Sequence, residues 1–288
     1  MASKSSKLRE MLKVLLSNRR SFYGFIGLCF FGLMASIGPW ITPLDMTVDH
    51  ENRFLPPSLS HPLGTDHAGR DIAQQIVHGS PGVLIIAFTA ASFGLLFAVV
   101  IGFLAALKGG MVDLILVRLI DVLLVLPRFP VLVILATLLP VKDSFTFGLV
   151  ISLFNWPSLA RSLRAQVLSL KGIEFVEVTK IMGLGTGHVI FKELVPNMIS
   201  YITINFIEMA RGAITASIGI MFLGLVPLDP TNWGMMLYLS TFTSGAIYVP
   251  HAIMYVLSPV LTIVLFQYCM VSFASGLNEV FDPRLRRI

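Results

Sequence analysis

Charged residues are scarce in this chain. They make up 13% of its 288 residues, whereas hydrophobic residues make up 55%. Soluble proteins carry a charge at ~25% of their positions. The mean hydropathy of +0.82 leads to the same conclusion, because a soluble protein of this size could not bury so much apolar surface. The composition therefore predicts a polytopic membrane protein and excludes a soluble catalytic domain.

The residues needed for several kinds of chemistry are also missing. The two cysteines, Cys29 and Cys269, each lie in an apolar run, which predicts small buried side chains and neither a disulfide nor a metal pair. The stretch GLGTGHV, residues 183–189, lacks the Lys-Ser/Thr pair of a phosphate-binding loop. The chain is therefore predicted not to be an enzyme and to bind no cofactor itself.

One polar segment of the sequence places two histidines near two carboxylates. His61 and His67 share a polar segment with Asp66 and Asp71, but this spacing is not specific for a metal ion. We therefore predict a structural or interfacial role for the segment and no metal site.

Long apolar runs are what the sequence has in abundance. Each is expected to form a membrane-spanning helix, since ~20 residues at about 1.5 Å per residue cross ~30 Å of hydrocarbon. Pro127 and Pro130 fall inside the third run. They are expected to kink that helix without dividing it, because membrane helices tolerate proline. The six candidate spans are residues 22–41, 81–107, 114–139, 145–160, 198–223 and 252–275.

The positive charges indicate which side of the membrane each loop faces. With six spans both termini lie on one side, and that side holds fifteen Lys and Arg residues against three on the other. Lys and Arg concentrate in cytoplasmic loops, so both termini are expected in the cytoplasm. The net charge of +5 is thus a topology signal, and nucleic-acid binding is not predicted. Leucines and a methionine at helical spacing in residues 8–15 predict a short amphipathic helix along the inner membrane surface, with a solvated basic leader as the alternative.

One polar segment, EFVEVTKIMGLGTGHVIFKELVP at residues 174–196, separates two apolar runs. It is expected to fold as helix, turn and helix, because GLGTG provides the backbone freedom that a sharp turn needs and Pro196 suits the start of a helix. A simple connection needs about four to six residues. The greater length and the polarity favour a cytoplasmic docking surface for a soluble partner, with an inert folded loop as the alternative.

Four stretches of the sequence resemble a known family. Glu177, Gly183 and Pro196 have the spacing of the loop that characterises permease subunits of ABC importers. HPLGTDHAGRD (61–71), NWGMML (232–237) and FDPRLR (281–286) resemble the branch that contains oligopeptide and dipeptide permeases of the C-subunit type. Together these stretches extend over nearly the whole chain.

The sequence departs from the family pattern in two places. Val178 and Thr179 stand where the loop of the family has two alanines. Ser217 stands where many relatives carry an acidic residue in the fifth span, which weakens a direct transfer of peptide as the substrate.

The resemblance implies an all-α, polytopic membrane protein with six transmembrane helices and a type I ABC importer-like fold, located in the cytoplasmic membrane of a prokaryote. It also implies three parts of the chain. Residues 1–80 hold the amphipathic helix, the first span and an external loop. Residues 81–277 form a five-helix permease core with a cytoplasmic coupling loop at 165–196, and residues 278–288 form a cytoplasmic tail.

The resemblance further implies partners. These are a second homologous permease subunit, two cytoplasmic ATP-binding subunits that hold ATP and Mg, an extracellular solute-binding protein and the membrane lipid. In this family the loop forms a coupling helix that sits in a cleft of the ATP-hydrolysing subunit. The residues that match this docking loop are Glu174, Glu177, Val178, Thr179, Gly183, Gly185, Gly187 and Pro196.

Charged side chains inside apolar runs need a reason, because each costs about 2.5–3.5 kcal/mol at a helix centre. They either line a translocation path or satisfy one another in pairs. Arg118 and Asp121, spaced i and i+3, are expected to pair on one helix face. The polar residues that are candidates for the path are Arg128, Asn155, Asn205, Glu208, Arg211 and Ser217.

The predicted function is ATP-driven, binding-protein-dependent import of oligopeptides or dipeptides by alternating access. Import of oligosaccharides by the same class of transporter is the alternative that the serine at position 217 keeps open. A secondary carrier or channel driven by an ion gradient would explain the intramembrane charges without partners, but would leave the long polar segment unexplained. A structural membrane scaffold would transport nothing.

Overall fold

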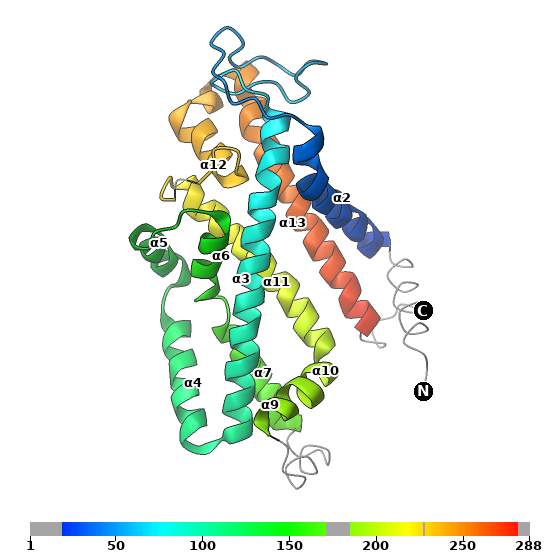
Figure 1. Ribbon diagram of the computed structural model, residues 1–288, viewed down its shortest axis with the longest axis vertical. Coiled ribbons are helices and arrows are strands. Elements are labelled where there is room, and N and C mark those ends of the chain that lie inside the picture. The colour runs from blue at the N-terminus through cyan, green and yellow to red at the C-terminus, as the bar shows by residue number, and fades with distance from the viewer. Residues whose placement is uncertain (1–18, 171–184, 227, 282–288) are drawn as a thin grey trace.

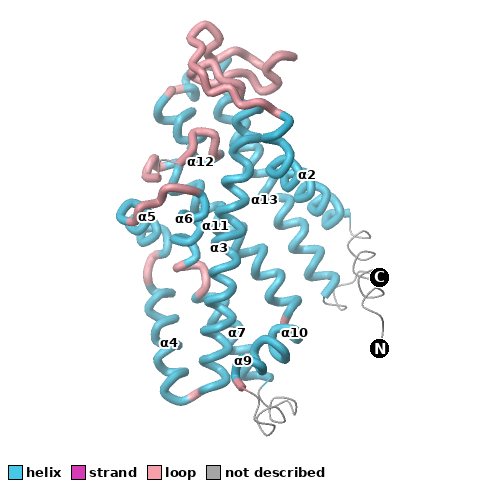
Figure 2. Tube along the Cα trace, in the orientation of Figure 1, coloured by secondary structure: helices cyan, strands magenta, loops and turns pink. Residues whose placement is uncertain are grey.

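The structure is a computed structural model that describes residues 19–170, 185–226 and 228–281. Within these ranges the regular elements are helices, and the only β feature is an isolated bridge between Thr65 and Asp71. Figures 1 and 2 show the helices arranged along one long axis, with the extended loop 42–71 at one end and the turn between α3 and α4 at the other. The predicted amphipathic helix at residues 8–15 lies outside the described residues.

Three described helices are long and apolar enough to cross a membrane. They are α2 (Arg19–Ile41), α3 (Ile72–Lys108) and α13 (Ile253–Phe281). They match the first, second and sixth predicted spans. α3 begins well before the predicted start at residue 81, because Asp71 caps its N-terminus by accepting a hydrogen bond from the main-chain N–H of Gln74.

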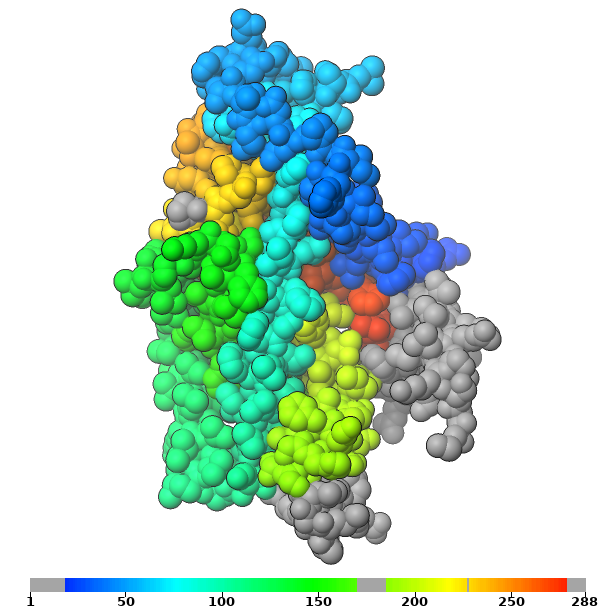
Figure 3. All heavy atoms as spheres, viewed as in Figure 1, coloured from blue at the N-terminus to red at the C-terminus, as the bar shows by residue number. Residues whose placement is uncertain are grey.

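Helix α3 is the centre of the molecule. It contacts α2, α6, α7, α11 and α13, and Figure 3 shows its surface running between α4 to α6 on one side and α2 on the other. Small residues permit this close packing, as is usual in membrane helices. A Cβ added at Gly102 would lie 2.6 Å from the carbonyl oxygen of Ala160, so the backbones of α3 and α7 touch there.

A proline lies within α3 without dividing it. Pro81 has no N–H to donate to the carbonyl of Val77 one turn earlier. The hydroxyl of Ser80 donates to that carbonyl at 2.6 Å and so replaces the lost hydrogen bond.

The third predicted span is divided, which corrects the expectation that its prolines only kink it. α4 (Gly110–Val125) and α5 (Arg128–Leu138) meet at an angle of 91°. Leu126 precedes Pro127 and adopts φ −67° and ψ 133°, the extended conformation to which proline restricts its predecessor. Pro130 lies in the first turn of α5, where no N–H is needed, and it does not break the helix.

The fourth predicted span is also made of two helices. α6 (Ser144–Ser152) begins with a capping box formed by Asp143 and Thr146. A turn at residues 153–156 separates it from α7 (Pro157–Leu170). α11 (Ile199–Phe222) matches the fifth predicted span and carries the charged residues Glu208 and Arg211. The described residues therefore contain three single-helix spans and one bent pair that could form a fourth, and six transmembrane helices remain a prediction.

Short helices complete the two ends. Near the α3–α4 turn, α9 (Thr186–His188), the π-helical turn η1 (Val189–Leu194) and α10 (Val195–Asn197) precede α11 (Figure 1). Towards the opposite end lie α12 (Trp233–Tyr238), η2 (Leu239–Thr243), η3 (Ala246–Tyr248) and η4 (Pro250–Ala252).

Candidate functional site

One face of α11 carries an exposed ion pair. Arg211 Nη2 donates to Glu208 Oε2 at 2.6 Å and Arg211 Nε donates to the same oxygen at 3.0 Å. The Arg211 and Glu208 side chains are 40% and 43% exposed. The pair satisfies itself electrostatically, but a surface that faces lipid would not carry two exposed charges. This face of α11 therefore suits contact with water, with a polar solute or with another polar subunit.

Neighbouring side chains extend this polar face. Thr215 lies one turn after Arg211 and is exposed. Gln267 of α13 donates through Nε2 to the main-chain carbonyl of Arg211 and to the hydroxyl of Thr215, both at 3.3 Å. Gln267 thus holds α13 against the helix that carries the ion pair.

Two other predicted path residues meet each other. Arg128, the first residue of α5, donates to Asn155 Oδ1 at 2.9 Å. Asn155 lies in the turn between α6 and α7, is buried, and donates through Nδ2 to the main-chain carbonyl of Met209 at 3.1 Å. The arginine that has no partner near it in the sequence therefore finds one through the fold, and the contact reaches α11 beside Glu208.

The last two predicted path residues bond within their own helix. Asn205 Nδ2 donates to the carbonyl of Tyr201 at 2.8 Å. The Ser217 hydroxyl donates to the carbonyl of Ile214 at 2.9 Å, and Ser217 is only 2% exposed. The structure groups Glu208 with Arg211 and Arg128 with Asn155, and it does not bring Asn205 or Ser217 to either pair.

The predicted coupling loop is described in part. Gly185 precedes α9 with the ordinary φ of −62°, and an added Cβ at Gly185 or Gly187 would meet no other described atom within 4 Å. Pro196 lies in the first turn of α10, as predicted for a helix start. The residues of the predicted docking loop that lie outside the described residues are Glu174, Glu177, Val178, Thr179 and Gly183.

The described end of this loop is anchored in the core. Val189, Ile190 and Leu194 are all buried and belong to the main hydrophobic cluster of the protein. The described end of the loop is therefore packed against the long helices.

Two ion pairs between α4 and α7 were not foreseen. Arg161 of α7 bonds to Asp121 of α4. Arg164 donates to both carboxylate oxygens of Asp113, at 2.5 and 2.6 Å. The expected pairing of Arg118 with Asp121 is therefore wrong, because the carboxylate turns to an arginine of another helix. The two arginines of α7 fall at i and i+3 on one amphipathic helix, which was the signal available in the sequence.

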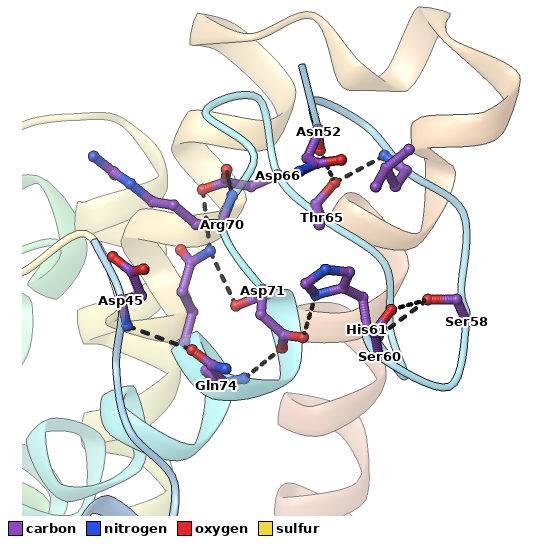
Figure 4. A network of polar contacts seen from close by, with 12 residues as sticks. Asp45, Asn52, Ser58, Ser60, His61, Thr65, Asp66, Arg70, Asp71 and Gln74 are labelled. Carbon is purple, nitrogen blue, oxygen red and sulfur yellow. Dashed lines mark hydrogen bonds and ion pairs between the residues drawn. The ribbon is translucent and has the colours of Figure 1, made fainter. Parts of the chain in front are cut away.

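The segment HPLGTDHAGRD closes loop 42–71 onto the N-terminus of α3 (Figure 4). His61 Nδ1 lies 2.9 Å from Asp71 Oδ2, while the other carboxylate oxygen of Asp71 caps α3. Asp66 is 1% exposed and accepts hydrogen bonds from the main-chain N–H groups of Ala68 and Arg70.

Glycine is required within the same segment. Gly69 has a φ of +81°, and an added Cβ would lie 2.1 Å from the carbonyl oxygen of Asp49. In the described residues no group of three or more His, Cys, Asp or Glu is arranged to hold a metal ion. The contacts of this segment are those of a tightly folded cap.

Described residues whose regular elements are all helices, with long apolar helices and an exposed polar face on α11, are typical of a membrane transport protein. The model of the family described as "Binding-protein-dependent transport system inner membrane component" matches residues 98–287. A second model, described as "N-terminal TM domain of oligopeptide transport permease C", matches residues 6–57.

Similar curated proteins cover nearly the whole chain. The dipeptide transport system permease protein DppC of Bacillus subtilis is 33% identical over 98% of this chain and 87% of its own. The oligopeptide transport system permease protein OppC of the same organism is 31% identical over 94% of this chain and 88% of its own. A di/tripeptide transport system permease protein of Pseudomonas aeruginosa is 27% identical over 98% and 93%.

The chain therefore belongs to the family of binding-protein-dependent transport system inner membrane components. The resemblance in the four sequence stretches is confirmed. The protein is a multi-pass inner-membrane permease, and its relatives are permease proteins of peptide transport systems.

Proposed function

We propose that this protein is a permease subunit of an ATP-driven importer that moves dipeptides or oligopeptides across the cytoplasmic membrane by alternating access. The membership of the family supports the class of transporter, and the names of the relatives support a peptide substrate. The structural observation that carries the proposal is the exposed Glu208–Arg211 pair on α11.

The chemistry of a peptide suits that pair. A short peptide is a zwitterion with an ammonium group at one end and a carboxylate at the other. A carboxylate such as Glu208 can accept hydrogen bonds from the ammonium group, and the guanidinium of Arg211 can bind the carboxylate of the peptide with two parallel hydrogen bonds. An oligosaccharide offers neither charge.

The place of Ser217 in the fold supports peptide as the first choice of substrate. Ser217 is buried and bonds within α11, so its side chain lies away from any exposed surface of that helix. A solute could not reach position 217 in this conformation. The lack of an acidic residue there is therefore no argument against a peptide substrate.

The proposed topology has six spans. α2, α3, the bent pair α4–α5, the pair α6–α7, α11 and α13 each cross the membrane once, and both termini lie in the cytoplasm. The positive charges support this orientation, since Lys108, Arg161 and Arg164 belong to the end that carries the predicted coupling loop.

The proposed assembly contains a second, similar permease subunit, two cytoplasmic ATP-binding subunits that hold ATP and Mg, and an external solute-binding protein. The translocation path forms between the two permease subunits, with Glu208 and Arg211 facing it. Closure of the ATP-binding subunits on ATP pushes the coupling loop, and the spans rock between outward-open and inward-open states.

Purification of the chain from its native membrane in a mild detergent, followed by mass spectrometry, tests this assembly. We expect a second permease subunit and ATP-binding subunits to be recovered with it. Transport of a labelled dipeptide by the purified assembly in liposomes should require ATP. Transport that runs on an ion gradient without ATP would instead identify a secondary carrier.

A further inference from the structure

Helix α4 has few packing contacts of its own. Ile120 is the one buried side chain of this fully described helix. The 91° bend after Val125 separates α4 from the direction of α5. Its position therefore depends on the elements beside it, which are α3 and α7.

Two ion pairs connect α4 to α7, and we call their four residues, Asp113, Asp121, Arg161 and Arg164, the α4–α7 seam. The pair formed by Arg164 and Asp113 is bidentate, and its side chains are only 27% and 22% exposed. A bidentate, partly buried pair fixes geometry more strongly than a solvated surface pair.

The spacing of the seam resists sliding. The two arginines lie one turn apart on α7, whereas the two carboxylates lie about two turns apart on α4. The arginines therefore reach in diverging directions. If α4 moved along α7 either way, one of the two ion pairs would have to lengthen.

The seam continues into a third contact. Along α4 and into α5, Asp113 pairs with Arg164, Asp121 pairs with Arg161, and Arg128 bonds to Asn155. The residue numbers rise along one segment and fall along the other. The two segments are thus joined in antiparallel order. Asn155 also donates to the carbonyl of Met209, which connects this line of contacts to α11 beside Glu208.

The seam lies between two regions that the proposed function requires to be coupled. α7 ends at Leu170, immediately before the segment predicted to dock on the ATP-binding subunit. α11 carries the polar face proposed to meet the solute.

We propose that Asp113, Asp121, Arg161 and Arg164 are positioning residues that make α4 and α7 move as one body. Movement of the segment after α7 is then passed to α4 and α5, and through Arg128 and Asn155 to α11. This inference rests on the proposed function, because it assigns a path for force within the same transporter.

Distances between spin labels in the complete transporter test the inference without reference to the substrate. Cysteines replace Leu119 of α4 and Leu168 of α7, both exposed, in a background with Cys29→Ser and Cys269→Ser. We expect the Leu119–Leu168 distance to be the same with and without bound ATP. A second label pair, on Leu119 and exposed Leu33 of α2, should change its distance between these states.

The variants Arg161→Ala and Arg164→Ala, combined, should broaden the Leu119–Leu168 distance distribution. They should also lower the amount of labelled dialanine transported per ATP about tenfold, a size typical of coupling between sites. Arg118→Ala is the matched control, since it removes an exposed charge from the same helix outside the seam, and it should change neither quantity.

A charge swap separates coupling from folding. Should the alanine variants fail to assemble, Asp113→Arg combined with Arg164→Asp restores the opposite charges and should recover both assembly and transport per ATP. An assembled swap that stays uncoupled would overturn the inference, as would a Leu119–Leu168 distance that changes with ATP in the otherwise unaltered seam. Neither result would affect the proposed function, which fails only if the assembly lacks ATP-binding subunits or does not transport the dipeptide with ATP.

Discussion

The indole nitrogen of Trp233 donates a hydrogen bond to the main-chain carbonyl of Ile76 across 3.0 Å. Trp233 is fully buried, and its ring lies edge-on to Phe31 of α2 and Phe266 of α13, with centroids 5.9 Å apart in both cases. One side chain of the short helix α12 thus connects three long helices. The stretch NWGMML, which served as a family signature in the sequence, is in the structure a packing element.

Replacement of Trp233 should therefore destabilise the subunit without affecting any polar site. Trp233→Ala should cost about 3–5 kcal/mol, because it leaves a large cavity. Trp233→Phe keeps most of the packing and should cost about 1 kcal/mol for the lost hydrogen bond. Thermal unfolding of the detergent-solubilised protein measures both. Equal effects of the two variants would show that the hydrogen bond, and not the packing, holds α12.

The role of the Glu208–Arg211 pair in transport can be tested first by removing one charge and then by exchanging the two residues. Arg211→Met leaves a carboxylate unpaired within the membrane, and we expect transport of a labelled dipeptide to fall by about tenfold or more. The matched control is Glu208→Arg combined with Arg211→Glu, which keeps an ion pair and the net charge.

The reversed pair separates two roles. A pair that binds the ends of a peptide should lose transport on reversal, since the two charges then stand in the opposite order along α11. A pair that only stabilises the helix should keep transport. Transport assays in liposomes, with the amount of inserted protein measured beside them, distinguish these results.

Variants of the predicted docking loop should lose the coupling of ATP hydrolysis to transport while the protein still folds. Glu177→Lys or Gly183→Val should leave membrane insertion intact and uncouple ATP hydrolysis from transport. Gly187→Leu should behave in the same way, because an added Cβ at Gly187 meets no other described atom within 4 Å.

A glycine outside the loop provides the control for these variants. Gly32→Ala in α2 also adds a Cβ that meets no atom within 4 Å, and it should leave coupling unchanged. The ratio of transported solute to hydrolysed ATP measures the effect. Normal ratios in all three loop variants would contradict the docking assignment.

The folded structure of loop 42–71, which contains His67, should become less stable in mild acid. Burial lowers the pKa of His67 below its usual value of 6.5, and the neighbouring Asp66 carboxylate opposes this only in part. The unfolded loop therefore binds a proton more readily than the folded loop, so stability falls as the pH drops below about 6.5 and stops falling once it is below the folded-state pKa.

A variant without a titrating ring checks this dependence. The His67 ring stacks on Tyr255 with centroids 5.8 Å apart, and His67→Phe keeps an aromatic ring in that position. Thermal unfolding between pH 7.5 and 5 should show a loss for the parent protein that the variant lacks. Identical pH profiles would show that another group controls the loop.

Much of the architecture could be read from the sequence because it depends on local composition. Apolar runs long enough to span the hydrocarbon placed α2, α11 and α13 close to their observed bounds, and placed α3 except for its first nine residues. The spacing of Glu177, Gly183 and Pro196, with three further stretches, identified the family that the comparisons confirm.

The candidate site was predictable only as a set of residues. A charge inside an apolar run marks a position that needs a partner. For this reason Glu208, Arg211 and Arg128 were predicted as candidates for the translocation path. The first two are close enough in one helix for the sequence to pair them. The partner of Arg128 comes from a turn 27 residues later, and no local pattern specifies it.

The sequence alone determined that the chain is a membrane permease, since hydrophobicity, charge asymmetry and motif spacing are properties of short segments. Tertiary structure decided the rest. It decided that Pro127 divides a span while Pro81 does not, because Ser80 replaces the missing hydrogen bond at Pro81. It also decided that Asp121 bonds to Arg161 and not to Arg118, because two packed helices bring distant charges closer than one helix turn does.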